Sequence, residues 1–130
     1  MILTAHQPVY IPWLGLFHKI ALAEHFCVFD RVQYQTKDFN NRNKIKTQAG
    51  ELWLSVPVES KEHFNKLLCD IKIVQGNWRR KQLKSIKLAY QKTPYFDRYF
   101  DGIEQVLANK QVFLSDLNHD FLMKILYWLK

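Results

Sequence analysis

Two short apolar runs joined by a helical segment occupy the first thirty or so residues, and they constrain the fold more than any other feature. The stretch "MILTA" has the pattern of a buried strand, and "HFCVFDRVQY" (25–34) has that of a second strand ending near Asp30. Between them, residues 13–24 predict a helix entered through Pro12, which suits a first helical turn. The apolar side of this helix is expected to hold Trp13, Leu14, Phe17, Ile20 and Ala21. A right-handed crossover through the helix would make the two strands parallel.

After residue 34 the pattern changes to a hairpin and then to helices. Residues 43–59 alternate between apolar and polar on both sides of "QAGE", which predicts a hairpin with Gly50 in its turn. Residues 67–74, "LLCDIKIV", predict a further strand. Asn77 and Ser115 are residue types that commonly precede helices. Three helices are expected, over 77–92, about 95–109 and about 115–130.

These elements predict a single α/β domain over residues 1–130. It would have a short, mostly parallel sheet with a β-hairpin, helices packed over the sheet, and a helical C-terminal third. The last helix carries an apolar stripe that ends on "ILYWLK" without a glycine cap. We therefore expect either that it packs back on the domain or that the natural polypeptide continues. In the second case a missing C-terminal half, or a second copy of the chain, would contact this helix.

The cysteine content and the apolar runs exclude several classes of protein. Cys27 and Cys69 lie in apolar surroundings and are expected to be buried free thiols. Their spacing does not match a zinc site, so no metal is predicted. No run approaches the roughly 18 apolar residues of a membrane span, and the start lacks the pattern of a secretory leader. These features predict a cytoplasmic protein.

The net charge of +7 is concentrated in the middle of the chain. Residues 61–98 carry ten basic and three acidic side chains, whereas the charges of residues 1–34 sum to zero. This pattern favours an anionic partner, either a phosphate-bearing small molecule or a nucleic acid.

Polar side chains follow each of the first two predicted strands. His6 and Gln7 come directly after the first strand, in a segment stiffened by prolines, and Asp30 ends the second. In open α/β sheets ligands bind beyond the carboxyl ends of the strands, so these side chains are expected at one crevice. The pKa of a histidine near neutrality suits His6 to proton transfer. Lys19, in the helix, could reach back to an anion, although a solvated lysine is an equal reading.

Two further groups of polar residues could extend this crevice. Gln33 and Tyr34 follow Asp30 closely. The stretch "NNRNKIK" (40–46) combines amides and cations, which recognise planar or phosphate groups, although an exposed polar turn has the same composition. The chain has only four glycines and no phosphate-binding glycine motif.

Four blocks of this sequence together resemble the WbqC-like family of bacterial proteins. They are "HQPVYIPWLGLFHKI", "FDRVQY", "NNRNKIKTQAGELWLSVPV" and "WRRKQLKSIKLAYQKTPYF", which occur in the family's order and cover most of residues 1–100. Members of the family are found among genes for O-antigen and other surface polysaccharides. The resemblance implies a cytoplasmic step in surface-polysaccharide biosynthesis, without specifying the reaction or a cofactor. Family members are usually much longer than this chain, and Gln82 stands where they tend to have a histidine.

The resemblance and the residue patterns together define the predicted site. Catalysis is assigned to His6 and Asp30, and substrate binding to Gln7, Tyr10, Lys19, Gln33, Tyr34, Asn41, Arg42 and Asn43. His6 would be the acid/base, Asp30 would position His6 or a sugar hydroxyl, and Arg42 and Lys19 would hold phosphate.

The predicted function is a transferase-like enzyme that acts on a nucleotide-activated or phosphorylated sugar. Two alternatives remain open on the sequence. One is a small basic nucleic-acid-binding protein that works through the helix from Arg79 to Lys92. The other is a non-catalytic partner subunit that contacts its partner through the last helix.

Overall fold

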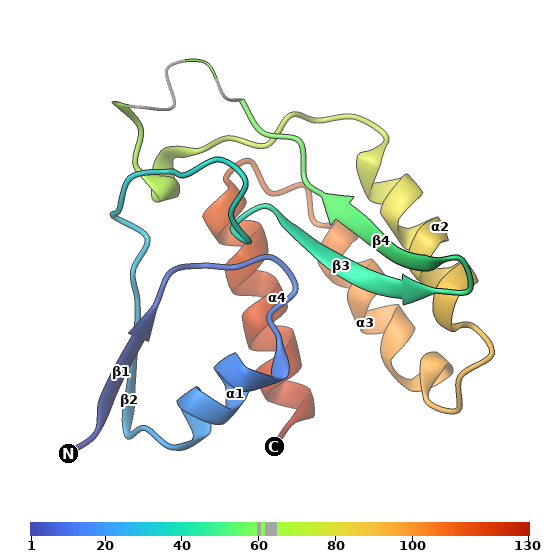
Figure 1. The fold of residues 1–130 in the computed structure, drawn as a ribbon, viewed down its shortest axis with the longest axis horizontal. Coiled ribbons are helices and arrows are strands. Elements are labelled where there is room, and N and C mark those ends of the chain that lie inside the picture. The colour runs from blue at the N-terminus through green and yellow to red at the C-terminus, as the bar shows by residue number, and fades with distance from the viewer. Residues whose placement is uncertain (60, 62–64) are drawn as a thin grey trace.

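The first strand, helix and second strand form the predicted parallel unit. The structure is a computed structural model that describes residues 1–59, 61 and 65–130. Strand β1 (Leu3–His6) pairs in parallel with β2 (His25–Val28), so that His6 lies opposite Val28. Helix α1 (Leu14–Ala21) connects the two strands (Figure 1). The carboxyl ends of both strands therefore lie at the same edge.

Helix α1 is shorter than predicted and turns a different side toward the protein. Its buried residues are Leu16 and Phe17, whereas Leu14 is 79% exposed. The sequence allows two apolar stripes at helical spacing, one through positions 14, 17 and 21 and one through 16, 17 and 20. Packing selects the second stripe, so the predicted burial of Trp13, Leu14 and Ala21 is wrong.

The predicted hairpin is confirmed. Strand β3 (Arg42–Thr47) pairs antiparallel with β4 (Gly50–Ser55). Gln48 and Ala49 form the turn, and Gly50 follows with a φ of 112°. That conformation favours glycine over residues with a Cβ atom.

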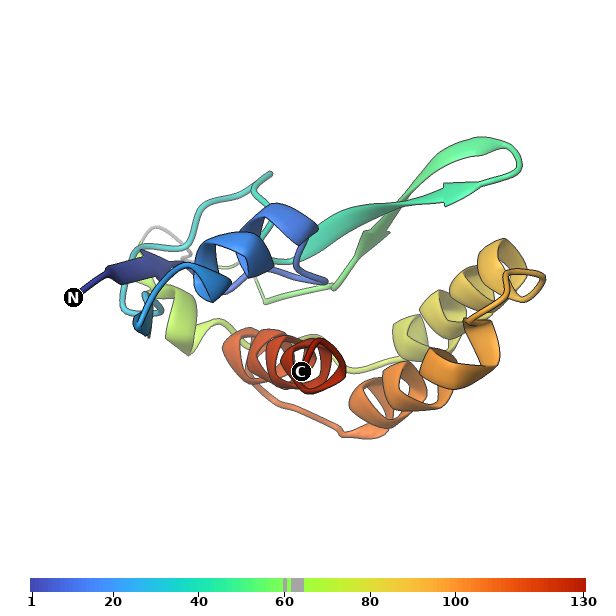
Figure 2. The same ribbon diagram turned by 90° about the horizontal axis from the view of Figure 1, so that it is seen from below.

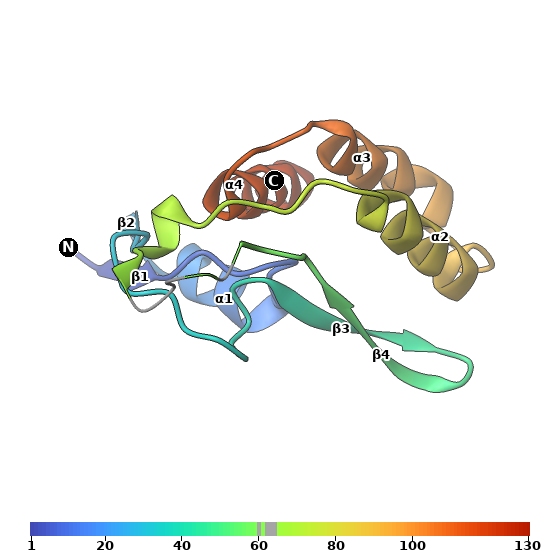
Figure 3. The ribbon, with the colours of Figure 1, turned by 90° about the horizontal axis from the view of Figure 1, so that it is seen from above.

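Three helices form the C-terminal part of the chain, as predicted. They are α2 (Trp78–Tyr90), α3 (Phe96–Ala108) and α4 (Leu114–Trp128). Figures 2 and 3 show these helices as one layer and α1 with the β3–β4 hairpin as the other. Asn77 directly precedes α2, and its side chain makes no capping hydrogen bond. Ser115 is the second residue of α4, and its hydroxyl donates to the Leu68 carbonyl oxygen at 3.3 Å.

The strand predicted over residues 67–74 does not form. This segment holds a short 3₁₀ helix, η2 (Leu68–Asp70), followed by isolated bridges from Lys72 to Phe113 and from Ile73 to Val58. Leu68 and Ile71 are both fully buried. Three positions apart, they would point to opposite faces of a strand but share one side of a 3₁₀ turn. Burial of both side chains in one core therefore favours the turn.

The core lies between the two layers. Its buried apolar residues are Tyr10, Tyr34, Leu54, Val56, Leu68, Ile71, Ile73, Trp78, Ile86, Val106, Leu107, Leu114, Leu117 and Phe121. The end of α4 packs back on α3. The centroids of the Trp128 and Tyr99 rings are 5.0 Å apart, and the Trp128 ring lies against Gly102. A Cβ atom on Gly102 would come within 2.3 Å of the Trp128 ring, so only glycine leaves room for this contact.

The parallel strand pair is thinly covered, unlike a typical parallel sheet. Leu3 is 63% exposed and Val28 is 37% exposed. Cys27 on β2 is also exposed and Cys69 is half-buried, both as free thiols. The predicted burial of Cys27 is wrong, because parallel strands bury their side chains only where other elements cover both faces of the sheet.

No helix in the described ranges is long and apolar enough to cross a membrane.

Candidate functional site

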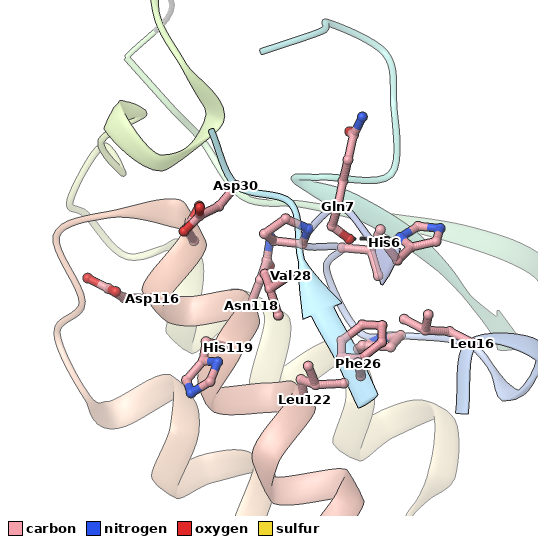
Figure 4. Close-up of a pocket in the computed structure, with 14 residues that line it drawn as sticks. His6, Gln7, Leu16, Phe26, Val28, Asp30, Asp116, Asn118, His119 and Leu122 are labelled. Carbon is pink, nitrogen blue, oxygen red and sulfur yellow. Dashed lines mark hydrogen bonds between the residues drawn. The ribbon is translucent and has the colours of Figure 1, made fainter. Parts of the chain in front are cut away.

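A cavity of about 330 Å³ lies at the carboxyl ends of β1 and β2 (Figure 4). The loop after β1 and the start of α1 form one side, and the first turns of α4 form another. Its lining residues are His6, Gln7, Pro8, Val9, Pro12, Leu16, Phe26, Val28, Asp30, Ser115, Asp116, Asn118, His119 and Leu122. The structure thus brings three of the predicted site residues, His6, Gln7 and Asp30, to one cavity.

The backbone fixes the orientation of the His6 imidazole. His6 Nδ1 lies 2.8 Å from the Gln7 carbonyl oxygen. A carbonyl can only accept a hydrogen bond, so Nδ1 carries the proton and Nε2 is the basic nitrogen. The ring also packs edge-on against Trp13, with 5.7 Å between ring centroids. The partner of Nδ1 is therefore a backbone carbonyl and not Asp30, and the other role predicted for Asp30, positioning a sugar hydroxyl, stays a prediction.

Helix α4 supplies polar side chains that the sequence analysis did not assign to the site. Asp116, Asn118 and His119 line the cavity from the first two turns of α4, with Asp116 at its edge on the side where Asp30 lies (Figure 4). Asn118 is 1% exposed, and its Nδ2 donates to the Asn40 carbonyl oxygen at 2.8 Å. Its Oδ1 is buried without a hydrogen-bond partner in the structure. The density of polar residues in "SDLNHD" is the signal in the sequence for this part of the site, whereas the apolar stripe of the same helix predicts only packing.

The cavity brings together the carboxylates of Asp30 and Asp116 and the imidazole of His119, and His6 lies in the loop that borders it. Among the described residues that line it, none is lysine or arginine. In the same described part of the chain, no three histidine, cysteine or acidic residues come together in a way that could hold a metal ion. The lining can accept hydrogen bonds from hydroxyl groups, and its apolar side chains can cover a C–H face.

Tyr10 and Tyr34 lie in the core and not at the cavity. Tyr10 is 0% exposed, and its hydroxyl donates to Gln82 Oε1. Gln82 Nε2 in turn donates to the Ser55 carbonyl oxygen, so α2 and β4 are joined at this point. Burial raises the pKa of the Tyr10 hydroxyl and, in the same direction, the pKa of Tyr34.

Asn41 and Asn43 bind the backbone next to the site. Asn43 Nδ2 donates to the carbonyl oxygens of Tyr10 at 3.2 Å and Ile11 at 2.7 Å. Ile11 has a φ of 49°, a left-handed conformation that is costly for a β-branched residue. Asn41 Nδ2 donates to the Val56 carbonyl oxygen at 3.0 Å. Both amides therefore hold chain segments together, and Asn43 holds the strained end of the loop that begins at His6.

Lys19, Gln33 and Arg42 lie outside the lining of the cavity. Lys19 Nζ donates to the Ala5 carbonyl oxygen at 2.9 Å. Because Ala5 directly precedes His6 in the chain, the exposed ammonium lies next to the start of the His6 loop. Arg42 lies with its guanidinium carbon 4.3 Å from the Trp53 ring centroid and donates to the Lys37 carbonyl oxygen. Gln33 forms an isolated bridge to Leu67.

Comparison with known proteins identifies relatives of this chain. Residues 7–130 match the WbqC-like protein family. The chain is also similar to "Uncharacterized protein Rv1507c" of Mycobacterium tuberculosis (strain ATCC 25618 / H37Rv), with 32% identity over 124 residues. That alignment covers 95% of this chain and 54% of the relative, so the chain spans about half the length of the curated relative it matches. No solved structure matches the chain. The family match extends over nearly all of the strands, loops and helices described above, and the chain belongs to the WbqC-like protein family.

Proposed function

We propose that this protein is a cytoplasmic enzyme of surface-polysaccharide biosynthesis that carries out a group transfer on a nucleotide-activated or phosphorylated sugar. The setting follows from the family resemblance described above. The observation that carries the proposal is the cavity at the β1 and β2 carboxyl ends, where His6 and Asp30 lie with Asp116 and His119 of α4. Such an edge is where open α/β sheets bind their ligands.

The lining of the cavity suits the sugar part of such a substrate. The carboxylates of Asp30 and Asp116 can each accept hydrogen bonds from hydroxyl groups, and His119 can accept or donate. Phe26 and Leu122 supply an apolar surface for the C–H face of a sugar ring. A sugar has hydroxyl groups for the polar side chains and a C–H face for the apolar side chains, so it matches both parts of the lining.

His6 is the proposed acid/base. In a group transfer to a sugar hydroxyl, the hydroxyl oxygen bonds to the transferred group and gives up its proton, while the bond from that group to its donor breaks and the donor fragment leaves with the electron pair. His6 Nε2 can take that proton because Nδ1 is already engaged by the Gln7 carbonyl oxygen. Lys19 is the proposed phosphate contact, since its ammonium lies at the Ala5 carbonyl oxygen and retains donors beyond that one bond.

A thermal-shift panel at low and high salt tests the proposal. The panel holds nucleotide sugars, sugar phosphates, free nucleotides, acyl-CoA, magnesium and a random oligonucleotide. We expect a nucleotide sugar or sugar phosphate to raise the melting temperature at both salt concentrations. This shift should disappear in His6→Ala and Asp30→Asn and persist in His25→Ala, a matched control because His25 is exposed on β2 outside the cavity. Ligand shifts that survive both cavity substitutions would contradict the site.

One observation favours the nucleic-acid alternative enough to keep the oligonucleotide in the panel. Arg80, Lys84 and Lys87 lie exposed on α2, and neither ion pair found in the described part of the chain includes them. Arg79 is not free for such a role, since its guanidinium donates to the Leu107 carbonyl oxygen and to Gln111. Stabilisation by the oligonucleotide alone, lost at high salt, would replace the enzyme with a nucleic-acid-binding protein.

A further inference from the structure

A second cavity lies against the same loop that borders the first. It measures about 380 Å³ and shares His6, Gln7, Pro8 and Val9 with the first cavity. In Figure 4 the side chains of His6 and Gln7 point away from Asp30, Asp116 and His119. The segment from His6 to Val9 therefore acts as a wall between two adjoining binding spaces.

The second cavity is lined by exposed aromatic rings. Trp13 is 41% exposed, Phe29 is 50% exposed and Phe39 is 37% exposed. The centroids of the Trp13 and Phe39 rings are 5.9 Å apart, and those of the Trp13 and His6 rings are 5.7 Å apart. Several large rings left open to water at one cavity are typical of a site for a flat, unsaturated group.

Two polar side chains of this cavity, Asp38 and Asn40, present hydrogen-bond acceptors. The carboxylate of Asp38 accepts the Phe39 backbone N–H through Oδ1 at 2.7 Å, which leaves its second oxygen available. Asn40 is 2% exposed, and its Oδ1 is buried without a partner. Among the described residues that line this cavity, none is lysine or arginine. The ligand should therefore bring N–H donors on its edge and should not place a phosphate inside the cavity.

We propose that the second cavity binds a nucleobase with an exocyclic amino group, which would stack on Trp13 with Phe39 at its edge and donate its amino N–H to Asp38. This proposal rests on the proposed function, because the base would belong to the nucleotide-activated sugar. The sugar then occupies the first cavity, and the phosphates cross the wall beside His6 and Gln7, near Lys19. Carboxylate side chains recognise the amino group of cytosine, and base stacking on aromatic rings is strong for any base.

The wall gives His6 a position between the two spaces. The His6 ring contacts that of Trp13, which lines the second cavity. His6 itself lines both cavities. A nucleotide sugar that spans the wall would hold the part of the sugar next to the phosphates, with its hydroxyl groups, close to this imidazole. The arrangement explains why a proline-rich segment is needed here, since a mobile wall would not keep the two parts of one substrate in register.

Matched nucleotide pairs test the subsite. Cytidine and uridine monophosphates differ in the group at one ring edge, an amino group in one and a carbonyl in the other, and adenosine and inosine monophosphates form a second such pair. Calorimetric titration of the wild-type chain should show the amino member of at least one pair binding about tenfold more tightly. Asp38→Asn should bring the two affinities of that pair close together, since an amide can also donate. Trp13→Ala should weaken both by about tenfold through lost stacking.

Tyr127→Ala is the control, because Tyr127 is an aromatic residue 65% exposed on α4 and outside both cavities. It should leave all affinities unchanged. Equal affinities within both pairs, no effect of Trp13→Ala, or ribose 5-phosphate binding as tightly as the nucleotides would overturn the nucleobase subsite.

The same titrations separate failure of the subsite from failure of the proposed function. If a nucleotide sugar binds and Asp30→Asn weakens it, but Trp13→Ala does not, the function stands and the base lies elsewhere. If mononucleotides bind through Trp13 and Asp38 but no nucleotide sugar binds more tightly than its matched nucleotide, the subsite stands and the proposed function fails.

Discussion

At the scale of single residues, Asn43 shows how a polar side chain can serve a site without contacting a ligand. Its amide donates to two successive carbonyl groups at the end of the loop that begins at His6. One of them belongs to Ile11, whose φ of 49° is sparsely populated for such a residue. The surrounding structure must hold this conformation, and Asn43 supplies two of the hydrogen bonds that do so.

Asn43→Asp should therefore destabilise the protein. The substitution keeps the oxygen that accepts the Lys44 N–H but replaces both donated hydrogen bonds with a carboxylate that faces carbonyl oxygens. We expect a loss of about 2 kcal/mol in the free energy of unfolding, measured by urea denaturation. Asn77→Asp is the control, since Asn77 is exposed and makes no capping bond, and it should change stability by less than about 0.5 kcal/mol. An Asn43→Asp protein as stable as wild type would show that the loop holds its shape without these bonds.

At the scale of elements, α1 shows the limit of a helical pattern in a short segment. The eight residues of α1 fit more than one apolar stripe, and the structure uses the one that includes Leu16. Leu16 lines the first cavity beside Phe26 of β2, so the orientation of α1 also shapes the site. The side of α1 that packs against the protein is therefore also the side that contributes to the cavity.

Paired alanine substitutions test this orientation. Leu16→Ala removes a side chain that is 4% exposed and should cost about 2–5 kcal/mol of stability. Leu14→Ala removes one that is 79% exposed and should cost less than about 0.5 kcal/mol. Thermal or urea unfolding of both variants measures the difference. A larger loss for Leu14→Ala than for Leu16→Ala would restore the stripe predicted from the sequence.

At the scale of the whole molecule, Tyr10 joins the two layers. Its hydroxyl donates to Gln82 on α2, and its ring packs edge-on against Phe121 of α4 with 5.6 Å between centroids. Gln82 continues the connection to β4 through the Ser55 carbonyl oxygen. The loop that carries His6 is thereby fixed to the hairpin and to two helices.

This burial predicts a loss of stability at alkaline pH. Desolvation raises the pKa of Tyr10 well above its ordinary value of about 10, so the folded protein keeps a proton that the unfolded chain releases. Above pH 10 the unfolded state binds fewer protons than the folded state, and stability should fall by about 1.4 kcal/mol per pH unit for this group. Tyr34 acts in the same direction. Urea unfolding between pH 9 and pH 11 measures the slope.

Tyr10→Phe separates the proton effect from the packing effect. The variant should be less stable at neutral pH by about 1–3 kcal/mol, because Gln82 Oε1 loses its donor in a buried place. Its stability should then fall less steeply above pH 10, since one titrating group is gone. An alkaline slope equal to that of wild type would mean that Tyr10 does not retain its proton in the folded state.

Local sequence patterns are enough to predict the strand–helix–strand start, the hairpin and the helical C-terminal third. Each of these features depends on local hydrophobic periodicity, on the position of a proline or glycine, or on the preference for right-handed crossovers between parallel strands. The same patterns also place His6, Gln7 and Asp30 at one edge, because the carboxyl ends of neighbouring parallel strands meet there. Those features are encoded within a few residues of where they act.

The tertiary structure alone decided which polar residues share a cavity. Asp116, Asn118 and His119 line the same cavity as Asp30, more than eighty positions earlier in the sequence, and no local pattern specifies which side of α4 meets the strands. Packing likewise gives Tyr10 and Asn43 structural hydrogen bonds in place of the predicted contacts with substrate. It also makes residues 68–70 a 3₁₀ helix in place of the predicted strand. The physical reason is that burial is shared among distant elements, so the face that a side chain presents depends on what the rest of the chain covers.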